Sequence, residues 1–283
     1  MMQIPIILTA FSTTPAAERA QKLIETGVKK KFPGHEIFWG YNSRSVTLAL
    51  RNNSSSSSDI RHTREILIRL AGEGRGRAIV QSLHLLPGQE FHCLHKEVRE
   101  VAGIDCLMGM PLLSSPRDYQ ALLDSLTPLI ERDPRQAVLL VGHGSRHPVW
   151  PAYLALETLL QRRFGARAYI GVIEHYPDTH DVEQRIAEAG FTRVLMIPLF
   201  LVTGIHYQRD MMGPGQHSWL TRLQSRGLEV ESFPDGLGLL PGIDELVVRH
   251  IEEAIAGSAG EKTESDHERN PAVDSLDSRV GGR

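Results

Sequence analysis

Apolar, β-branched runs alternate with amphipathic stretches along most of the chain. The apolar runs occupy residues 3–10, 77–85, 104–113, 136–142, 168–174 and 193–202. Apolar positions recur with helical spacing over residues 15–30, 62–72, 89–101, 116–131, 149–163, 181–189 and 216–226. Continuous apolar strands separated by amphipathic helices are typical of parallel sheets that helices cover on both faces. The pattern therefore predicts an α/β fold with mostly parallel sheets.

Two of the predicted helices begin with a clear start signal. Thr14-Pro15 and Ser115-Pro116 each place a hydroxyl residue at the N-cap and a proline at the first helical position. The serine run Ser54–Ser58 predicts a flexible loop. From Gly257 onward the sequence is polar and charged, so we expect residues 257–283 to form a disordered tail.

The two halves of the chain share a faint internal repeat. "IILTAFSTTPAAERAQKLI" (6–24) aligns with "LLVGHGSRHPVWPAYLALE" (139–157), and "LHLLPGQEF" (83–91) aligns with "LFLVTGIHY" (199–207). The repeat predicts two similar α/β lobes, residues 1–133 and 134–256, that face each other across a cleft. The alternative is a chance likeness between separate βα units. Clefts lined by the carboxyl ends of parallel strands commonly bind ligands.

Composition and charge narrow the class of protein further. The chain has 283 residues, 41% of them hydrophobic, and a formal net charge of −3, which is typical of a soluble globular protein and gives no sign of a nucleic-acid partner. Two cysteines, Cys93 and Cys106, exclude a disulfide framework and a four-thiolate zinc site. The apolar run at the start is too short for a membrane span or a signal peptide. We expect a cytoplasmic protein with no membrane partner, and a homo-oligomer remains open.

Polar side chains stand at the ends of the predicted strands. In the second lobe these are His143, Glu174 and His206, and in the first lobe His84 and, just beyond it, Glu90. Because adjacent parallel strands lie roughly 5 Å apart, side chains that leave neighbouring strand ends can converge. Two imidazoles and a carboxylate suit a divalent first-row metal such as cobalt, nickel, iron or zinc. The sequence therefore predicts a metal site in the second lobe, residues 134–256.

Each of these residues also has an ordinary structural interpretation. His143 and His206 are also consistent with loop histidines, and Glu174 with a solvent-facing acid or a helix N-cap. His84 stands between two leucines and is equally consistent with a core histidine. Glu90 is also consistent with a first-turn acid that the helix dipole favours.

Five segments together resemble a known family. "QSLHLLPGQEF", "GMPLLSS", "VGHGSRHP", "GVIEHYP" and "IPLFLVTGIHYQRDM" are similar to motifs of the anaerobic sirohydrochlorin cobaltochelatases, the class II chelatases of cobalamin biosynthesis. The likeness covers nearly the whole chain, to the helix near Ile251. "GHGSR" by itself is shared with the small chelatases, whereas its combination with "QSLH" and "PLLSS" is more specific. The resemblance implies cobalt ligands at His143, Glu174 and His206, and the first-lobe acid at Glu90.

The resemblance also implies contacts with the tetrapyrrole. This chain reads "LTAFSTT" where such enzymes have a Ser-Phe-Gly-Thr-Ser type of turn, yet Ser12 and Thr13 still offer hydroxyls to a substrate carboxylate. Sirohydrochlorin carries many carboxylates, which guanidinium groups recognise well. The candidate substrate-binding residues are therefore Ser12, Thr13, His84, Arg44, Arg146 and Arg209, with solvated surface charge as the alternative for the three arginines.

The implied reaction is insertion of Co²⁺ into a sirohydrochlorin-type tetrapyrrole with release of two protons, which is the lyase activity of a metal chelatase. His143 and Glu90 are the candidate catalytic residues, since each could accept a proton. The metal would be a substrate, with Fe²⁺ or Ni²⁺ possible, and we expect no permanently bound cofactor. A ferrochelatase acting on sirohydrochlorin or a porphyrin stays an alternative, because ligand type does not separate cobalt from iron. A non-catalytic metal- or tetrapyrrole-binding protein is the alternative from another class.

Overall fold

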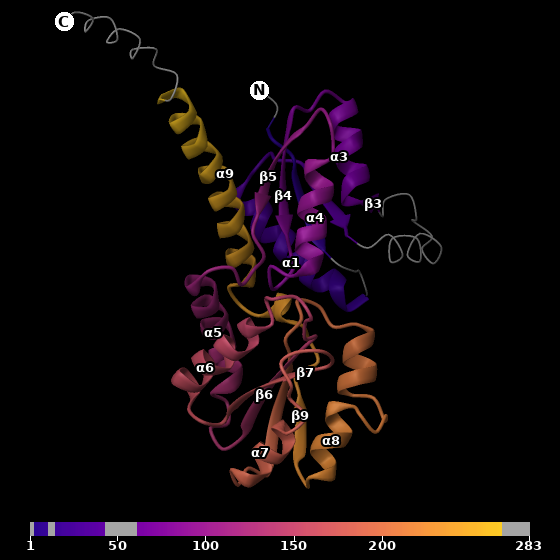
Figure 1. The fold of residues 1–283 in the computed structure, drawn as a ribbon, viewed down its shortest axis with the longest axis vertical. Coiled ribbons are helices and arrows are strands. Elements are labelled where there is room, and N and C mark those ends of the chain that lie inside the picture. Colours follow the sequence, from indigo (N-terminus) through magenta and orange to yellow (C-terminus); the bar gives the residue numbers. More distant parts are fainter. Residues whose placement is uncertain (1–2, 11–14, 43–60, 268–283) are drawn as a thin grey trace, which may run out of the picture.

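The computed structural model describes residues 3–10, 15–42 and 61–267, and within them the strands form two parallel sheets (Figure 1). The first sheet has the order β3-β2-β1-β4-β5 and the second has the order β7-β6-β8-β9. The strands of the first sheet are β1 (Ile6–Ala10), β2 (Ile37–Tyr41), β3 (Arg61–His62), β4 (Arg77–Ser82) and β5 (Asp105–Gly109). Those of the second are β6 (Ala137–Gly142), β7 (Ala168–Val172), β8 (Arg193–Pro198) and β9 (Glu229–Ser232).

Helices follow most of the strands, as the amphipathic stretches predicted. They are α1 (Pro15–Lys31), α3 (Thr63–Gly72), α4 (Gln89–Arg99), α5 (Pro116–Ile130), α6 (Pro151–Phe164), α7 (Val182–Glu188), α8 (Trp219–Ser225) and α9 (Ile243–His267). Two short helical turns complete the elements, the π-helical η1 (Tyr207–Met211) and the 3₁₀ turn η2 (Leu237–Leu239). Ser115 caps α5 with Pro116 in the first turn, which confirms one start signal, whereas Thr14 lies outside the described residues.

The two lobes share one strand order. Without the edge strand β3, the first sheet has the order β2-β1-β4-β5, and the second sheet has the order β7-β6-β8-β9. Counted along the chain, both orders are second, first, third and fourth strand. In each lobe the first strand pairs with the second and the third, as β1 does with β2 and β4 and as β6 does with β7 and β8. This common topology agrees with the internal repeat and confirms the two-lobed α/β fold.

Both sheets are buried on both faces, which explains their continuous apolar strands. Ile6 and Leu8 of β1 and Val138 and Leu140 of β6 belong to one hydrophobic cluster that extends through both lobes. The opposite faces of β1 and β6 pack into two separate clusters, covered by α3 and α4 in the first lobe and by α7 and α8 in the second. A core common to the lobes holds the two sheets in one arrangement.

Two helices cross between the lobes. Helix α5 follows the last strand of the first sheet but packs against α6 of the second lobe, and α9 follows the second sheet but packs against α1, β4 and β5 (Figure 1). The boundary expected after residue 133 therefore separates the two sheets along the sequence, but α5 and α9 each pack against the other lobe. The backbone of α9 remains helical beyond Gly257, where the tail was expected to start, as far as His267. The Ser54–Ser58 loop and residues 268–283 lie outside the described residues.

No helix of the described residues is sufficiently long and apolar to cross a membrane.

Candidate active site

The predicted metal ligands lie at the ends of three neighbouring strands of the second sheet. His143 follows β6, Glu174 lies just beyond β7, and His206 lies in the turn after β8. His143 Nδ1 is 3.4 Å from Glu174 Oε1, and the rings of His143 and His206 meet edge to face with centroids 4.7 Å apart. The side chains remain between a third and a half exposed. The strand order therefore brings the three residues together, with His143 in the middle.

The glycines on either side of His143 are required by close packing. A Cβ at Gly142 would lie 2.5 Å from Tyr153 Cε1, and one at Gly144 would lie 1.7 Å from the carbonyl oxygen of Glu174. Gly144 also has a φ of +86°, in the left-handed region that favours glycine. These contacts explain the Gly-His-Gly sequence, because the bare backbone lets the β6 and β7 ends approach each other. Backbone hydrogen bonds, such as Glu174 N–H to the His143 carbonyl at 3.1 Å, hold that approach.

Glu174 is followed by a histidine with unusual backbone geometry. His175 has a φ of +66°, which is rare for a residue with a side chain. Arg146 Nε donates to His175 Nδ1 at 3.1 Å, and His175 Nε2 lies 3.7 Å from Glu174 Oε2. Arg146, which the sequence suggested for substrate binding, thus contacts His175 through one of its donors.

His206 is hydrogen-bonded to the carboxylate of Asp210, one helical turn further along the chain. Its Nδ1 lies 2.7 Å from Asp210 Oδ2, and the Asp210 carboxylate also accepts two hydrogen bonds from Arg209, at 2.8 and 2.9 Å. Arg209 foremost, and His206 as well, hold the pKa of Asp210 below its usual range, against the opposing effect of burial. The turn is the π-helical η1, a geometry that is frequent at functional sites.

Glu90 of the first lobe influences the electrostatics of this site. Glu90 lies in the first turn of α4, and its backbone carbonyl accepts a hydrogen bond of 3.0 Å from Asn42 Nδ2. Burial and the His206 ring lower the pKa of His143, while the charges of Glu174 and Glu90 partly oppose that decrease. Glu90 also adds to the effect of burial that raises the pKa of Tyr153 to about 12. The charge of Glu90 thus acts on two residues of the second lobe.

Further contacts join the start of α4 to the loop after β6. The rings of His92 in α4 and His147 in the loop after β6 have centroids 5.0 Å apart. A Cβ at Gly88, the residue before α4, would stand 3.6 Å from Val149 Cγ1, which is ordinary van der Waals contact. The start of α4 thus packs directly against the loop that begins with Gly-His-Gly.

The remaining predicted residues have different positions. His84 is buried, its Nδ1 lies 2.8 Å from Ser82 Oγ, and its Nε2 has no hydrogen-bond partner. Burial lowers the pKa of His84 to about 4, so its ring is neutral at pH 7. This burial agrees with the ordinary structural interpretation of His84 as a core histidine, and its contact with the tetrapyrrole stays a prediction. Ser12, Thr13 and Arg44 lie outside the described residues.

Across the described parts of the chain, no three His, Cys, Asp or Glu side chains are grouped closely enough to hold a metal ion together. His143 contacts each of the other two predicted ligands, and the three form an open set rather than a closed cage. Open, partly exposed ligands are the arrangement expected where a metal must both arrive and leave.

Three residues of this region, Asp210, His175 and Tyr153, were not among the residues predicted for the site. The spacing of His206 and Asp210, four residues apart in a helical turn, is a signal that could have shown the first of them. The Tyr153 hydroxyl accepts a hydrogen bond of 3.1 Å from Gly144 N–H, a contact between a helix and a loop that has no local pattern.

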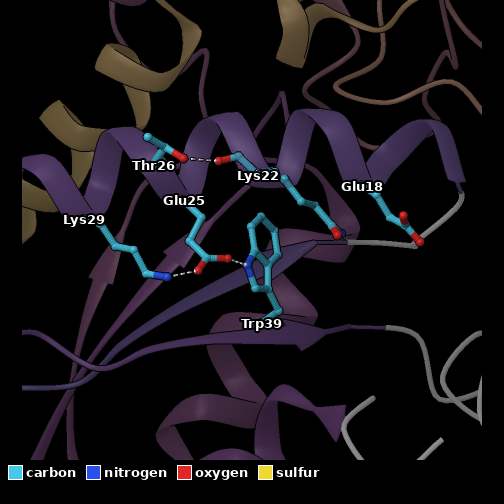
Figure 2. A pocket seen from close by; sticks show the side chains of 7 residues that line it. Glu18, Lys22, Glu25, Thr26, Lys29 and Trp39 are labelled. Atoms are coloured by element: carbon cyan, nitrogen blue, oxygen red, sulfur yellow. Dashed lines mark hydrogen bonds and ion pairs between the residues drawn. The ribbon is translucent and has the colours of Figure 1, made fainter. Parts of the chain in front are cut away.

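A separate hollow of about 350 Å³ lies between α1 and β2, on another part of the first lobe (Figure 2). Two of its charged groups, Glu25 and Lys29, contact each other, and Glu25 also accepts a hydrogen bond of 2.8 Å from Trp39 Nε1. None of the residues predicted for the active site lines it.

Comparisons with known proteins agree with the fold and with the family that the motifs suggested. The family model described as cobalt chelatase (CbiK) matches residues 5–256. The chain is 28% identical over 262 residues to the sirohydrochlorin cobaltochelatase of Salmonella typhimurium, which covers 90% of this chain and 97% of that protein. It is also 28% identical over 258 residues to the sirohydrochlorin cobaltochelatase CbiKC of Nitratidesulfovibrio vulgaris, with 89% and 90% covered.

A solved structure shows the same architecture. SirB from Bacillus subtilis with Fe³⁺ superimposes with a TM-score of 0.66 over 92% of this chain and 98% of that chain, at 16% identity. This likeness confirms the fold. Because the family model spans most of the sequence, the chain belongs to the cobalt chelatase (CbiK) family.

Proposed function

We propose that this protein inserts Co²⁺ into sirohydrochlorin, and that His143, Glu174 and His206 bind the incoming cation. The observation that carries the proposal is that His143, in the middle of three adjacent strand ends of the second sheet, contacts both Glu174 and His206. Membership of the cobalt chelatase family and two relatives named sirohydrochlorin cobaltochelatase support the choice of metal and tetrapyrrole.

The reaction exchanges two protons for one cation without oxidation or reduction. Two pyrrole N–H bonds break, four ring nitrogens donate electron pairs to Co²⁺, and two protons pass to bases. The lowered pKa of His143 leaves its imidazole neutral at pH 7, with a lone pair for the metal or for a proton. Glu90, on the other lobe, would accept a proton from the opposite side of the macrocycle.

The metal set is suited to a cation that leaves with the product. The ligands are two imidazoles and one carboxylate, and positions around the cation stay open for the ring nitrogens. Glu174 contributes the negative charge that attracts the cation. Arg146 and Arg209 are both exposed beside this set and could pair with substrate carboxylates through donors that His175 and Asp210 do not use. That role, and those of Ser12, Thr13 and Arg44, stay predictions.

Imidazole and carboxylate ligands bind cobalt, nickel and iron in the order of their general affinities, so this site by itself does not select cobalt. A ferrochelatase activity on the same tetrapyrrole is therefore an outcome that the experiment must distinguish. The absence of a resident cofactor, the cytoplasmic location and a homo-oligomer likewise remain predictions.

The test is anaerobic insertion of Co²⁺, Fe²⁺ and Ni²⁺ into sirohydrochlorin, followed by the change in the tetrapyrrole absorption spectrum. We expect His143→Ala and His206→Ala to abolish insertion and to keep the melting temperature, since both side chains are partly exposed. His180→Ala is the matched control, because His180 is an exposed histidine that pairs with Asp178.

Three results would contradict the proposal. Normal insertion by either variant would remove that histidine from the site. Faster insertion of Fe²⁺ than of Co²⁺ by the unaltered protein would make it a ferrochelatase. Binding of sirohydrochlorin and Co²⁺ without any product would favour the non-catalytic alternative.

A further inference from the structure

We propose that Asp210 is a positioning residue, which holds His206 through Nδ1 so that Nε2 is the atom offered to the cation. The inference rests on the proposed function, because it takes His206 as a cobalt ligand. It adds a carboxylate that touches neither the cation nor the tetrapyrrole and acts only through the imidazole.

The hydrogen bond itself sets the tautomer. His206 Nδ1 and Asp210 Oδ2 are 2.7 Å apart, and an ionised carboxylate can only accept a hydrogen bond. The proton of the neutral imidazole must therefore lie on Nδ1, and the lone pair must lie on Nε2. Histidines that bind metals commonly have such a second partner, which fixes the ring and strengthens it as a donor.

Asp210 is not free to act as a ligand in place of His206. Both of its oxygens accept hydrogen bonds from Arg209, and one of them also contacts His206. Only about a fifth of its side chain is exposed, at 21%, compared with 36% for His206. The carboxylate is thus less exposed than the His206 ring and is held by two neighbours.

The turn that carries this pair is fixed to the sheet. Met212 N–H donates a hydrogen bond of 2.9 Å to the carbonyl of Tyr207, five residues earlier, and this bond closes the π-helical turn that contains Asp210. Met211 is fully buried, and the Tyr207 hydroxyl lies 2.9 Å from Ser232 Oγ at the end of β9. Asp210 is therefore a fixed support rather than a mobile surface acid.

His143 is held differently. The carboxylate beside it, 3.4 Å away, is Glu174, which is itself a proposed cobalt ligand. Co²⁺ would bind the Glu174 carboxylate, whereas the hydrogen bond between Asp210 and His206 would persist in the presence of the cation. The pair with Asp210 therefore belongs to the support of the site and not to its ligand set.

The experiment measures Co²⁺ binding to the full chain without tetrapyrrole, by titration and by the visible absorption bands of bound Co²⁺. We expect Asp210→Asn to weaken binding by roughly 10–100-fold, the usual effect of losing such a partner, and to alter the bands. Asp178→Asn is the matched control, since it removes a comparable Asp–His pair, with His180, at an exposed place. The control should bind Co²⁺ as the unaltered protein does.

Two double variants decide how Asp210 acts. If it acts through His206, then Asp210→Asn should cause no further loss in a His206→Ala background. An equal loss in both backgrounds would overturn the proposal. In Arg209→Ala/Asp210→Asn the unpaired charge of Arg209 is gone, and a return to normal affinity would mean that this charge, and not the imidazole, caused the loss.

Failure of the inference and failure of the proposed function give different results. Normal Co²⁺ binding by Asp210→Asn together with weak binding by His206→Ala would overturn the inference alone. Normal binding by His206→Ala would overturn the proposed metal site, and the inference with it.

Discussion

Asp118→Asn should be among the most destabilising single changes at the junction of the two lobes. Asp118 lies in the first turn of α5 and is only 1% exposed. Its Oδ2 accepts hydrogen bonds from the backbone N–H groups of Ser114 at 3.0 Å and Ser115 at 2.6 Å. Its Oδ1 pairs with Arg249 and lies 3.2 Å from His250 Nε2, and both of these residues belong to α9. One carboxylate thus joins the two helices that cross between the lobes.

The magnitude follows from what the amide would leave behind. An asparagine oxygen can still accept from Ser114 and Ser115, but its NH₂ group would then face the donors of Arg249 and His250. Removing one partner of a buried ion pair costs about 3–5 kcal/mol, because the other charge stays buried without compensation. Since the Arg249 side chain is 16% exposed and can regain some water, we expect about 3 kcal/mol. For a chain of this size the melting temperature should fall by roughly 6–12 °C.

The assay is thermal unfolding at constant pH, with Asp124→Asn as the matched control. Asp124 lies on the same helix and pairs with Arg163, but its side chain is 61% exposed, so its loss should cost about 0–1 kcal/mol. A double variant, Asp118→Asn/Arg249→Met, should recover part of the loss, because the unpaired guanidinium is gone. Equal melting temperatures for Asp118→Asn and Asp124→Asn would refute the reasoning.

Two further predictions concern the active site. Glu90→Gln should keep Co²⁺ binding and lower the insertion rate by roughly 10²–10⁴-fold, the usual cost of losing a general base, and Glu100→Gln at the far end of α4 is its control; insertion at the normal rate would exclude Glu90 as the base. Gly144→Ala should destabilise the protein and stop insertion, because a Cβ there meets the Glu174 carbonyl at 1.7 Å. Gly190→Ala is its control, because Gly190 has a similar φ of +83° with open space around it, so that change measures the backbone strain alone. Equal effects of the two changes on insertion and on the melting temperature would show that the contact with the Glu174 carbonyl is not the cause.

Periodicity predicted the lobes because both sheets are buried on two faces. Apart from Gln136 and Arg193 at their starts, the runs 136–142 and 193–202 are apolar, and the strands β6 and β8 lie within them. The position of the candidate site followed from the same rule, since parallel strands end at one edge of a sheet, where their last side chains can converge. For this reason the order of strands and polar residues along the chain was sufficient to group His143, Glu174 and His206.

Strands without a continuous apolar run were not predicted. Strand β9 reads Glu-Val-Glu-Ser and lies at the edge of its sheet, so only part of it is buried. Strand β2 includes a glycine and is half-buried over most of its length. The crossing of α5 and α9 also left no local signal, because it depends on contacts such as that of Asp118 with Arg249, 131 positions apart.

The arrangement separates two tasks that the proposed function requires. The proposed ligands His143, Glu174 and His206 all belong to the second lobe, and backbone contacts within that lobe, such as the one that requires glycine at 144, set their spacing. The proposed base, Glu90, lies in α4 of the first lobe, and this helix packs against the loop after β6. Cation binding should therefore depend on one lobe, and proton removal on how the two lobes meet. A substitution that loosens the junction would then lower insertion more than it lowers affinity for Co²⁺.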